Sequence, residues 1–162
     1  MISVLALDID GVLTDGRVTL DDAGRELKTL SYRDIDAISL AQSKGLRLVL
    51  VTGEESTWVD MIARRLKISV YKGAKDKHRA LQTLCSELGI DLKQVCYVGD
   101  SARDLPGLKI VELGLVPADA LLASVPGKHR VLEHPGGNGA VAEAIEIVLE
   151  FQKDADGGTE RG

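Results

Sequence analysis

Aromatic residues are scarce in this chain: Trp, Tyr and Phe together make up 3% of its 162 residues. A core with so few rings has to be built from Val, Leu, Ile and Ala, and hydrophobic residues reach an ordinary 44%. A chain of this length fits one domain and can bury roughly two-thirds of the surface that it exposes when unfolded. The composition therefore indicates a single globular domain with an aliphatic core.

Cysteine is equally scarce. The two cysteines, Cys85 and Cys96, lie in apolar segments and form no CxxC or Cys/His pattern. Protein zinc sites are typically marked by such patterns, so the sequence argues against a zinc site. We expect two buried free thiols.

Positive charge is in deficit, since 20 Lys and Arg stand against 25 Asp and Glu, for a net charge of −5 at pH 7. An acidic protein is not attracted to phosphate backbones or anionic lipids, which argues against a broad nucleic-acid or membrane surface. A small anionic substrate remains compatible with this charge if cations are concentrated at the site. The first residues, MISVLALDIDG, lack the basic start of a signal peptide, and Asp8 interrupts their apolar run. We therefore expect a cytoplasmic protein.

Short apolar runs alternate with helical patterns along the chain, which predicts a doubly wound, Rossmann-like parallel α/β sheet. The predicted strands cover residues 2–7, 46–51, 69–71, 94–98, 110–113 and 130–132. The predicted helices cover residues 34–43, 56–66, 76–88, 102–108, 118–124 and 138–151. A β-hairpin insertion is expected over residues 17–30, around the turn-rich segment 21–24. We expect one domain over residues 1–151 and a polar, Gly-rich, flexible tail over 152–162.

Polar groups follow three of the predicted strands. Sites in such sheets lie at the carboxyl ends of the strands. The candidates there are Asp8 and Asp10 after the first strand, Thr52 after the second, and Asp100 and Asp104 after the fourth, with Lys77 beginning a helix in the same region. A lone DxD at a strand end is often only a turn or a helix cap, but these pieces recur at successive strand ends and helix starts.

The clustered carboxylates need a compensating cation, because crowding raises the energy of their ionised state. Hard carboxylate oxygens suit Mg²⁺, which commonly also takes an oxygen of a substrate phosphate. Lys77 brings positive charge toward a phosphate ester, and Thr52 with nearby N–H groups can hold phosphate oxygens. These residue types indicate chemistry on a phosphate group.

In this order the motifs resemble the haloacid dehalogenase superfamily of phosphotransferases. The matching segments are DIDG at 8–11, Thr52 in LVLVTGE, Lys77 in KGAKDK and GDSARD at 99–104. The resemblance implies a phosphatase in which Asp8 is the nucleophile, forming an aspartyl-phosphate, and Asp10 is the general acid and base. It further implies that Thr52, Gly53 and Lys77 bind the phosphoryl group. Mg²⁺ would be held by Asp8, the backbone carbonyl of Asp10 and Asp100, with Asp104 supporting the metal shell.

Further segments resemble the capless branch of that superfamily, which contains phosphatases of eight- and nine-carbon keto-deoxy sugar acids. They are GVLTDG at 11–16, Arg33-Asp34, GAKDK at 73–77, PADA at 117–120 and GGNGAV at 136–141. Only 41 residues separate Asp10 from Thr52, and 24 separate Thr52 from Lys77, so neither gap has room for a cap domain. The resemblance implies a phosphorylated sugar-acid substrate and a homotetramer in which the hairpins associate.

Three positions differ from the eight-carbon enzymes of that branch. Glu54 stands where they usually carry Arg, Ser101 replaces a second Asp, and Ala142 replaces an Arg. A glutamate at position 54 is more similar to what the nine-carbon enzymes carry there. We therefore expect Glu54 to face the leaving group and to favour a nine-carbon 9-phosphate over 3-deoxy-manno-octulosonate 8-phosphate. The alternative is a solvated Glu54 at a helix start, stabilised by the helix dipole.

Two other functions stay open. One is the same phosphatase reaction on another small phosphoester. The other is a non-catalytic assembly or regulatory module, related to the C-terminal domain of some acylneuraminate cytidylyltransferases. The glycines at 136, 137 and 139 likewise have two interpretations, a flexible lead-in to the last helix or a role near the active site.

Overall fold

The computed structural model describes residues 1–157, with side chains to residue 153. Six parallel strands form one sheet in the order β5-β4-β1-β6-β7-β8. Their bounds are β1 (Val4–Leu7), β4 (Arg47–Val51), β5 (Ser69–Tyr71), β6 (Val95–Val98), β7 (Leu113–Val116) and β8 (Arg130–Val131). The chain builds outward from β1 on one side and then from β6 on the other, so the predicted doubly wound fold is confirmed.

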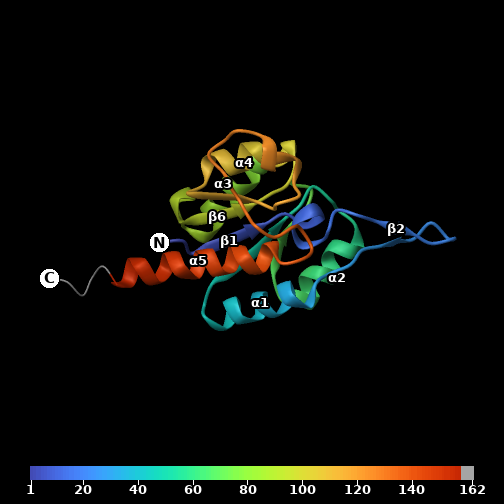
Figure 1. The fold of residues 1–162 in the computed structure, drawn as a ribbon, viewed down its shortest axis with the longest axis horizontal. Helices are drawn as coiled ribbons and strands as arrows, with labels where there is room; N and C mark the ends of the chain where they lie inside the picture. The colour runs from blue at the N-terminus through green and yellow to red at the C-terminus, as the bar shows by residue number, and fades with distance from the viewer. Residues whose placement is uncertain (158–162) are drawn as a thin grey trace.

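Helices cover both faces of the sheet (Figure 1). One face carries α1, α2 and α5, and the other carries α3 and α4. Their bounds are α1 (Tyr32–Ser43), α2 (Thr57–Leu66), α3 (Lys77–Leu88), α4 (Leu105–Ile110) and α5 (Ala140–Gly157), with short 3₁₀ turns at Leu92–Gln94, Ala102–Asp104 and Leu121–Ser124. Among the helices described, none is long and apolar enough to cross a membrane.

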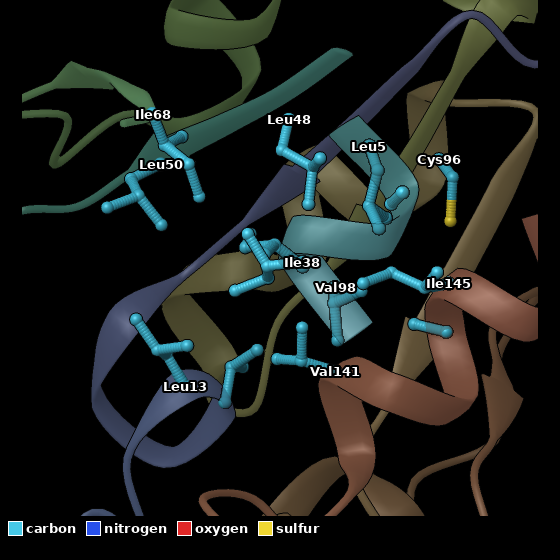
Figure 2. Close-up of a cluster of buried hydrophobic side chains, with 14 of the residues drawn as sticks. Leu5, Leu13, Ile38, Leu48, Leu50, Ile68, Cys96, Val98, Val141 and Ile145 are labelled. Atoms are coloured by element: carbon cyan, nitrogen blue, oxygen red, sulfur yellow. The ribbon is translucent and has the colours of Figure 1, made fainter. Parts of the chain in front are cut away.

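The core is aliphatic and lies in two layers. In β1, Leu5 and Leu7 point to the layer under α1 and α5, whereas Val4 and Ala6 point to the layer under α3 and α4. Figure 2 shows part of the first layer, where Ile38 from α1 and Val141 from α5 meet side chains of the sheet. Because both faces are covered, the strands are apolar at consecutive positions instead of alternating.

Both cysteines are free and buried, as predicted. Burial raises the pKa of the Cys96 thiol, which keeps it protonated.

The predicted hairpin is present as β2 (Thr19–Leu20) and β3 (Glu26–Leu27), which form a separate antiparallel pair. It projects from the sheet, as the β2 ribbon shows in Figure 1. Asp21 closes its turn by accepting the N–H groups of Ala23 and Arg25. Between Asp10 and Thr52 the chain otherwise holds only most of the short helical turn Ile9–Leu13, α1 and β4, and between Thr52 and Lys77 only α2 and β5. No cap domain is present in these segments.

Three predicted boundaries were wrong. The strand expected at 110–113 is β7, Leu113–Val116, because α4 runs on to Ile110. Gly114 lies inside this strand where it crosses α4, since a Cβ there would lie 2.9 Å from the carbonyl oxygen of Leu108. The helix expected at 118–124 is only the 3₁₀ turn Leu121–Ser124, and α5 continues past Phe151 to Gly157. Of the predicted flexible tail, residues 158–162 lie outside the described residues.

The glycine segment before α5 packs against the loop that follows β1. A side chain at Gly136 would collide with that loop, because its Cβ would lie 1.9 Å from the carbonyl oxygen of Gly11. The N–H of Gly137 donates to the carbonyl of Val12 at 3.0 Å. Asp34, fully buried in α1, accepts the N–H groups of Gly139 and Ala142 and so fixes the start of α5. This segment is therefore a support for the loop that carries Asp10.

Candidate active site

The carboxyl ends of β1, β4 and β6 meet at one edge of the sheet, where a cavity of about 410 Å³ opens. All the candidate site residues predicted from the sequence line this cavity: Asp8, Asp10, Thr52, Gly53, Glu54, Lys77, Asp100 and Asp104. Four more residues complete the lining: Ala74, Lys75, Ser101 and Arg103. Because these residues follow parallel strands, the fold brings them to one edge of the sheet although they are up to 96 positions apart, from 8 to 104.

Asp8 is the first residue after β1, and its backbone N–H donates to the carbonyl of Val98 at 3.0 Å. This bond continues the pairing of β1 with β6 and fixes the Asp8 backbone at the cavity. Its carboxylate oxygen Oδ1 lies 3.0 Å from Nζ of Lys77. The side chain is 13% exposed, so one carboxylate is held by an ammonium but still reaches the cavity.

Lys77 begins α3 and is buried. The helix start is fixed by Asp76, whose side chain accepts the N–H of Arg79 at 3.1 Å. Besides Asp8, the ammonium lies 3.0 Å from the carbonyl of Val51 and 3.1 Å from Asp104. A buried ammonium needs such acceptors, because its desolvation is otherwise costly. Lys77 therefore ties the ends of β1, β4 and the loop after β6 together.

Tyr97 lies in β6, and its hydroxyl belongs to the same network. It donates to Oδ1 of Asp104 at 2.5 Å and accepts from Lys77 at 3.2 Å. Burial, with the charges of Asp104 and Asp8, raises the pKa of Tyr97, which keeps the hydroxyl a donor. From the sequence, Tyr97 is predicted only to be part of an apolar strand. Nothing in the strand pattern indicates that its hydroxyl has a polar role.

Asp104 organises the loop after β6. Its Oδ2 accepts the backbone N–H groups of Asp100 and Ser101 at 3.0 and 3.1 Å, and the hydroxyl of Ser101 at 3.3 Å. Although burial raises the pKa of Asp104, Lys77, the hydroxyl of Tyr97 and the N–H of Ser101 outweigh it and lower that pKa below its ordinary value. The carboxylate is therefore ionised and engaged by protein groups at both oxygens, which suits the supporting role predicted for it.

Asp8, Asp100 and Asp104 can bring one carboxylate oxygen each within 4.8 Å of the others. Burial raises the pKa of Asp8 to about 6, with Asp104 adding to the rise and Lys77 opposing it. Burial and the charges of Asp8 and Asp104 raise the pKa of Asp100 to about 7. Two carboxylates that hold protons this tightly mark a site with too little positive charge for its acids.

A divalent cation fits this deficit. Carboxylate oxygens are the ligands that Mg²⁺ prefers, and Asp8 and Asp100 each have oxygens that reach the cavity. Gly11 allows the loop after β1 to approach Asp100, since a Cβ there would lie 1.9 Å from Oδ2 of Asp100. Its φ of 80° also favours glycine. The donor set and the close approach of the two loops are therefore suited to Mg²⁺.

Thr52 is buried at the end of β4, and its N–H pairs with the carbonyl of Tyr71. Its hydroxyl oxygen accepts the N–H of Glu54 at 3.1 Å, which leaves the hydroxyl proton available to a phosphate oxygen. The carbonyl of Thr52 accepts the N–H of Ala74 at 2.9 Å, so the loops after β4 and β5 are joined. A hydroxyl and two backbone loops thus face the carboxylate cluster across the cavity.

Lys28 was not among the residues predicted for the site. It follows β3, and its Nζ lies 2.9 Å from Oδ1 of Asp10 and 3.0 Å from Oε1 of Glu54. The same nitrogen lies 4.8 Å from the ring centre of Trp58. Its partners are 18 and 26 positions away, and a lone lysine in an exposed hairpin gives no sequence signal for such a bridge.

A profile of the haloacid dehalogenase-like hydrolase family matches residues 23–111, more than half of the chain. The 3-deoxy-D-manno-octulosonate 8-phosphate phosphatase of Yersinia pestis is 33% identical over 159 residues, 98% of this chain and 85% of that protein. The Escherichia coli K12 protein of that name is 34% identical over 156 residues, 96% of this chain and 83% of that protein. Both alignments are long enough to take in the segment with Asp8 and Asp10, which lies before the profile match.

Solved structures give the same family. The Moraxella catarrhalis phosphatase of the same name, in complex with a magnesium ion, a phosphate ion and a KDO molecule, superposes with a TM-score of 0.86. It is 31% identical, and the match covers 96% of this chain and 90% of that one. The chain therefore belongs to the haloacid dehalogenase-like hydrolases. The relatives named here are phosphoric monoester hydrolases, and the Moraxella catarrhalis structure shares the fold of this chain over 96% of its length.

Proposed function

We propose that this protein is a Mg²⁺-dependent phosphatase that removes the phosphate of a phosphorylated keto-deoxy sugar acid through an aspartyl-phosphate on Asp8. The observation that carries the proposal is the position of Asp8. Its carboxylate reaches the cavity while Lys77 holds one oxygen at 3.0 Å, and Asp100 and Thr52 line the same cavity. A carboxylate fixed beside a buried ammonium is suited to attack a dianionic phosphate, because the cation offsets the repulsion between the two anions.

The reaction proceeds in two displacements at phosphorus. In the first, an oxygen of Asp8 forms a bond to phosphorus, the bond to the ester oxygen breaks, and Asp10 gives that oxygen its proton. In the second, Asp10 takes a proton from water, the water oxygen bonds to phosphorus, and the bond to Asp8 breaks. The products are the sugar alcohol and inorganic phosphate. Asp10 suits both steps because it lies two residues after Asp8 and its side chain is 40% exposed at the cavity.

The remaining residues hold the reacting groups. Asp8, Asp100 and the backbone carbonyl of Asp10 would hold Mg²⁺, which supplies positive charge to the phosphoryl oxygens. The Thr52 hydroxyl, the N–H of Gly53 and the ammonium of Lys77 would bind those oxygens. Asp104, engaged by Lys77 and Tyr97, keeps the loop that carries Asp100 in place.

The sugar-acid substrate is proposed from the names of the relatives and from the charge of the cavity. Lys75 and Arg103 line the cavity and add two cations to its rim. A sugar acid carries a carboxylate besides its phosphate, and these cations are suited to meet it. The relatives point to 3-deoxy-manno-octulosonate 8-phosphate, whereas Glu54 favours the nine-carbon 9-phosphate. The homotetramer and the cytoplasmic location expected from the sequence also stay predictions.

A screen of phosphate esters tests the proposal. The purified protein is incubated with Mg²⁺ and either of the two sugar-acid phosphates, glycerol phosphate or p-nitrophenyl phosphate, and released phosphate is measured. We expect a kcat/KM for one sugar acid about a hundredfold above that for p-nitrophenyl phosphate, because binding of the sugar is used in the transition state. Equal values for all esters would contradict the sugar-acid substrate. No release of phosphate from any ester would contradict the phosphatase itself.

A further inference from the structure

Lys28 is a cation buried at the base of an exposed hairpin. Its side chain is only 6% exposed, whereas the strands on either side of the turn are exposed. The ammonium lies between the carboxylates of Asp10 and Glu54, at 2.9 and 3.0 Å. Burying an ammonium is costly unless it is paired, so its two partners define where the side chain sits.

The ammonium is also fixed from a third direction. Trp58, in the first turn of α2, has its ring centre 4.8 Å from Nζ, within the range of a cation–π contact. Burial lowers the pKa of Lys28, but its bonds to Asp10 and Glu54 outweigh this and raise the pKa above its ordinary value. Lys28 is therefore charged and held by groups from two separate loops and a helix.

Glu54 faces Lys28 with one carboxylate oxygen, and its other oxygen is buried. Oε1 accepts from Lys28, while Oε2 is buried and has no hydrogen-bond partner among the described residues. The side chain is 35% exposed and lines the cavity, but neither oxygen is both exposed and free. In this arrangement Glu54 holds the ammonium of Lys28, and neither of its oxygens is available to accept a hydrogen bond from a substrate hydroxyl.

Asp10 is in the opposite situation. Its side chain is 40% exposed, and among the described residues Lys28 is the one side chain that donates a hydrogen bond to it. Lys28 binds Oδ1, so Oδ2 is the oxygen left to carry and transfer a proton. A general acid must lie within hydrogen-bond reach of the leaving oxygen, and a mobile carboxyl would lose much of that advantage.

We infer that Lys28 is a positioning residue for Asp10: anchored by Glu54 and Trp58, it holds Oδ1 so that Oδ2 faces the leaving group. The inference rests on the proposed function, because it needs Asp10 to protonate an ester oxygen. It also assigns Glu54 a role through Lys28. The hairpin thereby contributes a residue to the chemistry.

Two esters without a carboxylate separate positioning from substrate binding. Protonation matters for glycerol phosphate, whose alkoxide is a poor leaving group, and little for p-nitrophenyl phosphate, whose phenolate leaves unaided. The kcat/KM of each ester reports steps up to formation of the aspartyl-phosphate. We therefore compare Lys28→Met, Lys28→Arg and Asp10→Asn with wild type on both esters in Mg²⁺. Lys72→Met is the matched control, since Lys72 also follows a strand and pairs with Asp60 at 2.9 Å, away from the cavity.

We expect Lys28→Met to lose about tenfold more kcat/KM on glycerol phosphate than on p-nitrophenyl phosphate, a smaller version of the pattern of Asp10→Asn. Lys28→Arg should recover part of the loss on glycerol phosphate, and Lys72→Met should match wild type. Glu54→Gln, which leaves the ammonium on Asp10, should show a weaker form of the same pattern. The losses in the Lys28→Met/Glu54→Gln double variant should be less than additive.

Several results would overturn the inference. Equal losses of Lys28→Met on both esters would assign Lys28 a structural role, and unchanged values would assign it none. If Lys28→Met fails to give a cooperative thermal transition, the ester ratio of Glu54→Gln decides in the same way. A wild type that hydrolyses neither ester, nor a sugar-acid phosphate, would instead remove the proposed function and with it the inference.

Discussion

The ammonium of Lys77 lies 3.0 Å from the carboxylate of Asp8, which precedes it by 69 positions. The pair joins the first residue after β1 to the first residue of α3 across the carboxyl edge of the sheet. Because Lys77 also binds Asp104 at 3.1 Å, one buried cation balances two of the three clustered carboxylates. The third, Asp100, has no such partner in the described structure; burial, with the charges of Asp8 and Asp104, raises its pKa to about 7.

Replacement of Asp10 should separate catalysis from binding. Asp10→Asn removes the proton donor and acceptor, so we expect turnover of glycerol phosphate to fall by roughly 10²–10⁴-fold. The backbone carbonyl at this position is unchanged, so binding of Mg²⁺ and phosphate, measured by calorimetry, should persist. Loss of metal binding in a folded Asp10→Asn protein would mean that the carboxylate itself is a ligand.

The pH dependence of stability should reveal the metal site. Without metal, the raised pKa values of Asp8, about 6, and Asp100, about 7, mean that the folded protein holds more protons than the unfolded chain between about pH 4 and about pH 7. The stability of the metal-free protein therefore falls as pH rises through 6 and 7. Mg²⁺ binds the ionised carboxylates, so its stabilising effect should grow over the same range.

Thermal unfolding with and without millimolar Mg²⁺, at about pH 5 and about pH 8, measures this effect. We expect a small increase in Tm at the lower pH and a clear increase at the higher one. Asp100→Asn should reduce the increase at the higher pH, because it removes a proposed ligand. A shift in Tm that is the same at both pH values would show that the metal does not compete with protons at these carboxylates.

The hairpin should mediate assembly. Val18, Leu20 and Leu27 are apolar and exposed on it, and an isolated two-stranded ribbon is marginally stable by itself. We expect a homotetramer by light scattering at micromolar concentration. Leu20→Lys should give smaller species, whereas Leu121→Lys, at an exposed leucine in the 3₁₀ turn far along the chain, should not. A fully active wild-type monomer would contradict the assembly.

Substitution of Glu54 tests which sugar acid is preferred. Wild type should favour the nine-carbon 9-phosphate over 3-deoxy-manno-octulosonate 8-phosphate by about tenfold, because Glu54 lines the cavity and its charge repels a substrate carboxylate held close to it. Glu54→Arg brings a guanidinium toward Lys28, so it should lower kcat on both substrates. The ratio of the two kcat/KM values is the diagnostic quantity, and it should move toward the octulosonate, whose carboxylate can pair with Arg. An unchanged ratio would mean that the residue at position 54 does not determine which of the two substrates is preferred.

The polar residues at strand ends could be predicted because the fold concentrates them by rule. Asp8, Thr52 and Asp100 each follow a short apolar run, and parallel strands place such residues at one edge. The start of α3 could also be predicted, because Asp76 is followed by a helical pattern. No long-range information was needed for these residues.

The sequence does not predict three other features in the same way: the position of Lys28, the role of the Tyr97 hydroxyl and the bounds of β7. Lys28 depends on how the hairpin folds back toward Asp10, and the hydroxyl of Tyr97 depends on where α3 places Lys77. In β7, apolar residues occur on both sides of Glu112, so the pattern alone does not tell where α4 ends. The position of Gly114 against Leu108 decides it, and that contact exists only in the folded chain.

The central claim is that Asp8 is the nucleophile, and trapping the aspartyl-phosphate tests it most directly. Asp10→Asn should form this species from p-nitrophenyl phosphate, which needs no acid, and hydrolyse it slowly because the base is absent. Acid quenching followed by borohydride reduction converts an acyl phosphate to an alcohol, so mass spectrometry should find homoserine at position 8. The Asp8→Asn/Asp10→Asn double variant should give none. Continued turnover by Asp8→Asn above a few per cent of wild type, with no reduced residue at position 8, would contradict the account.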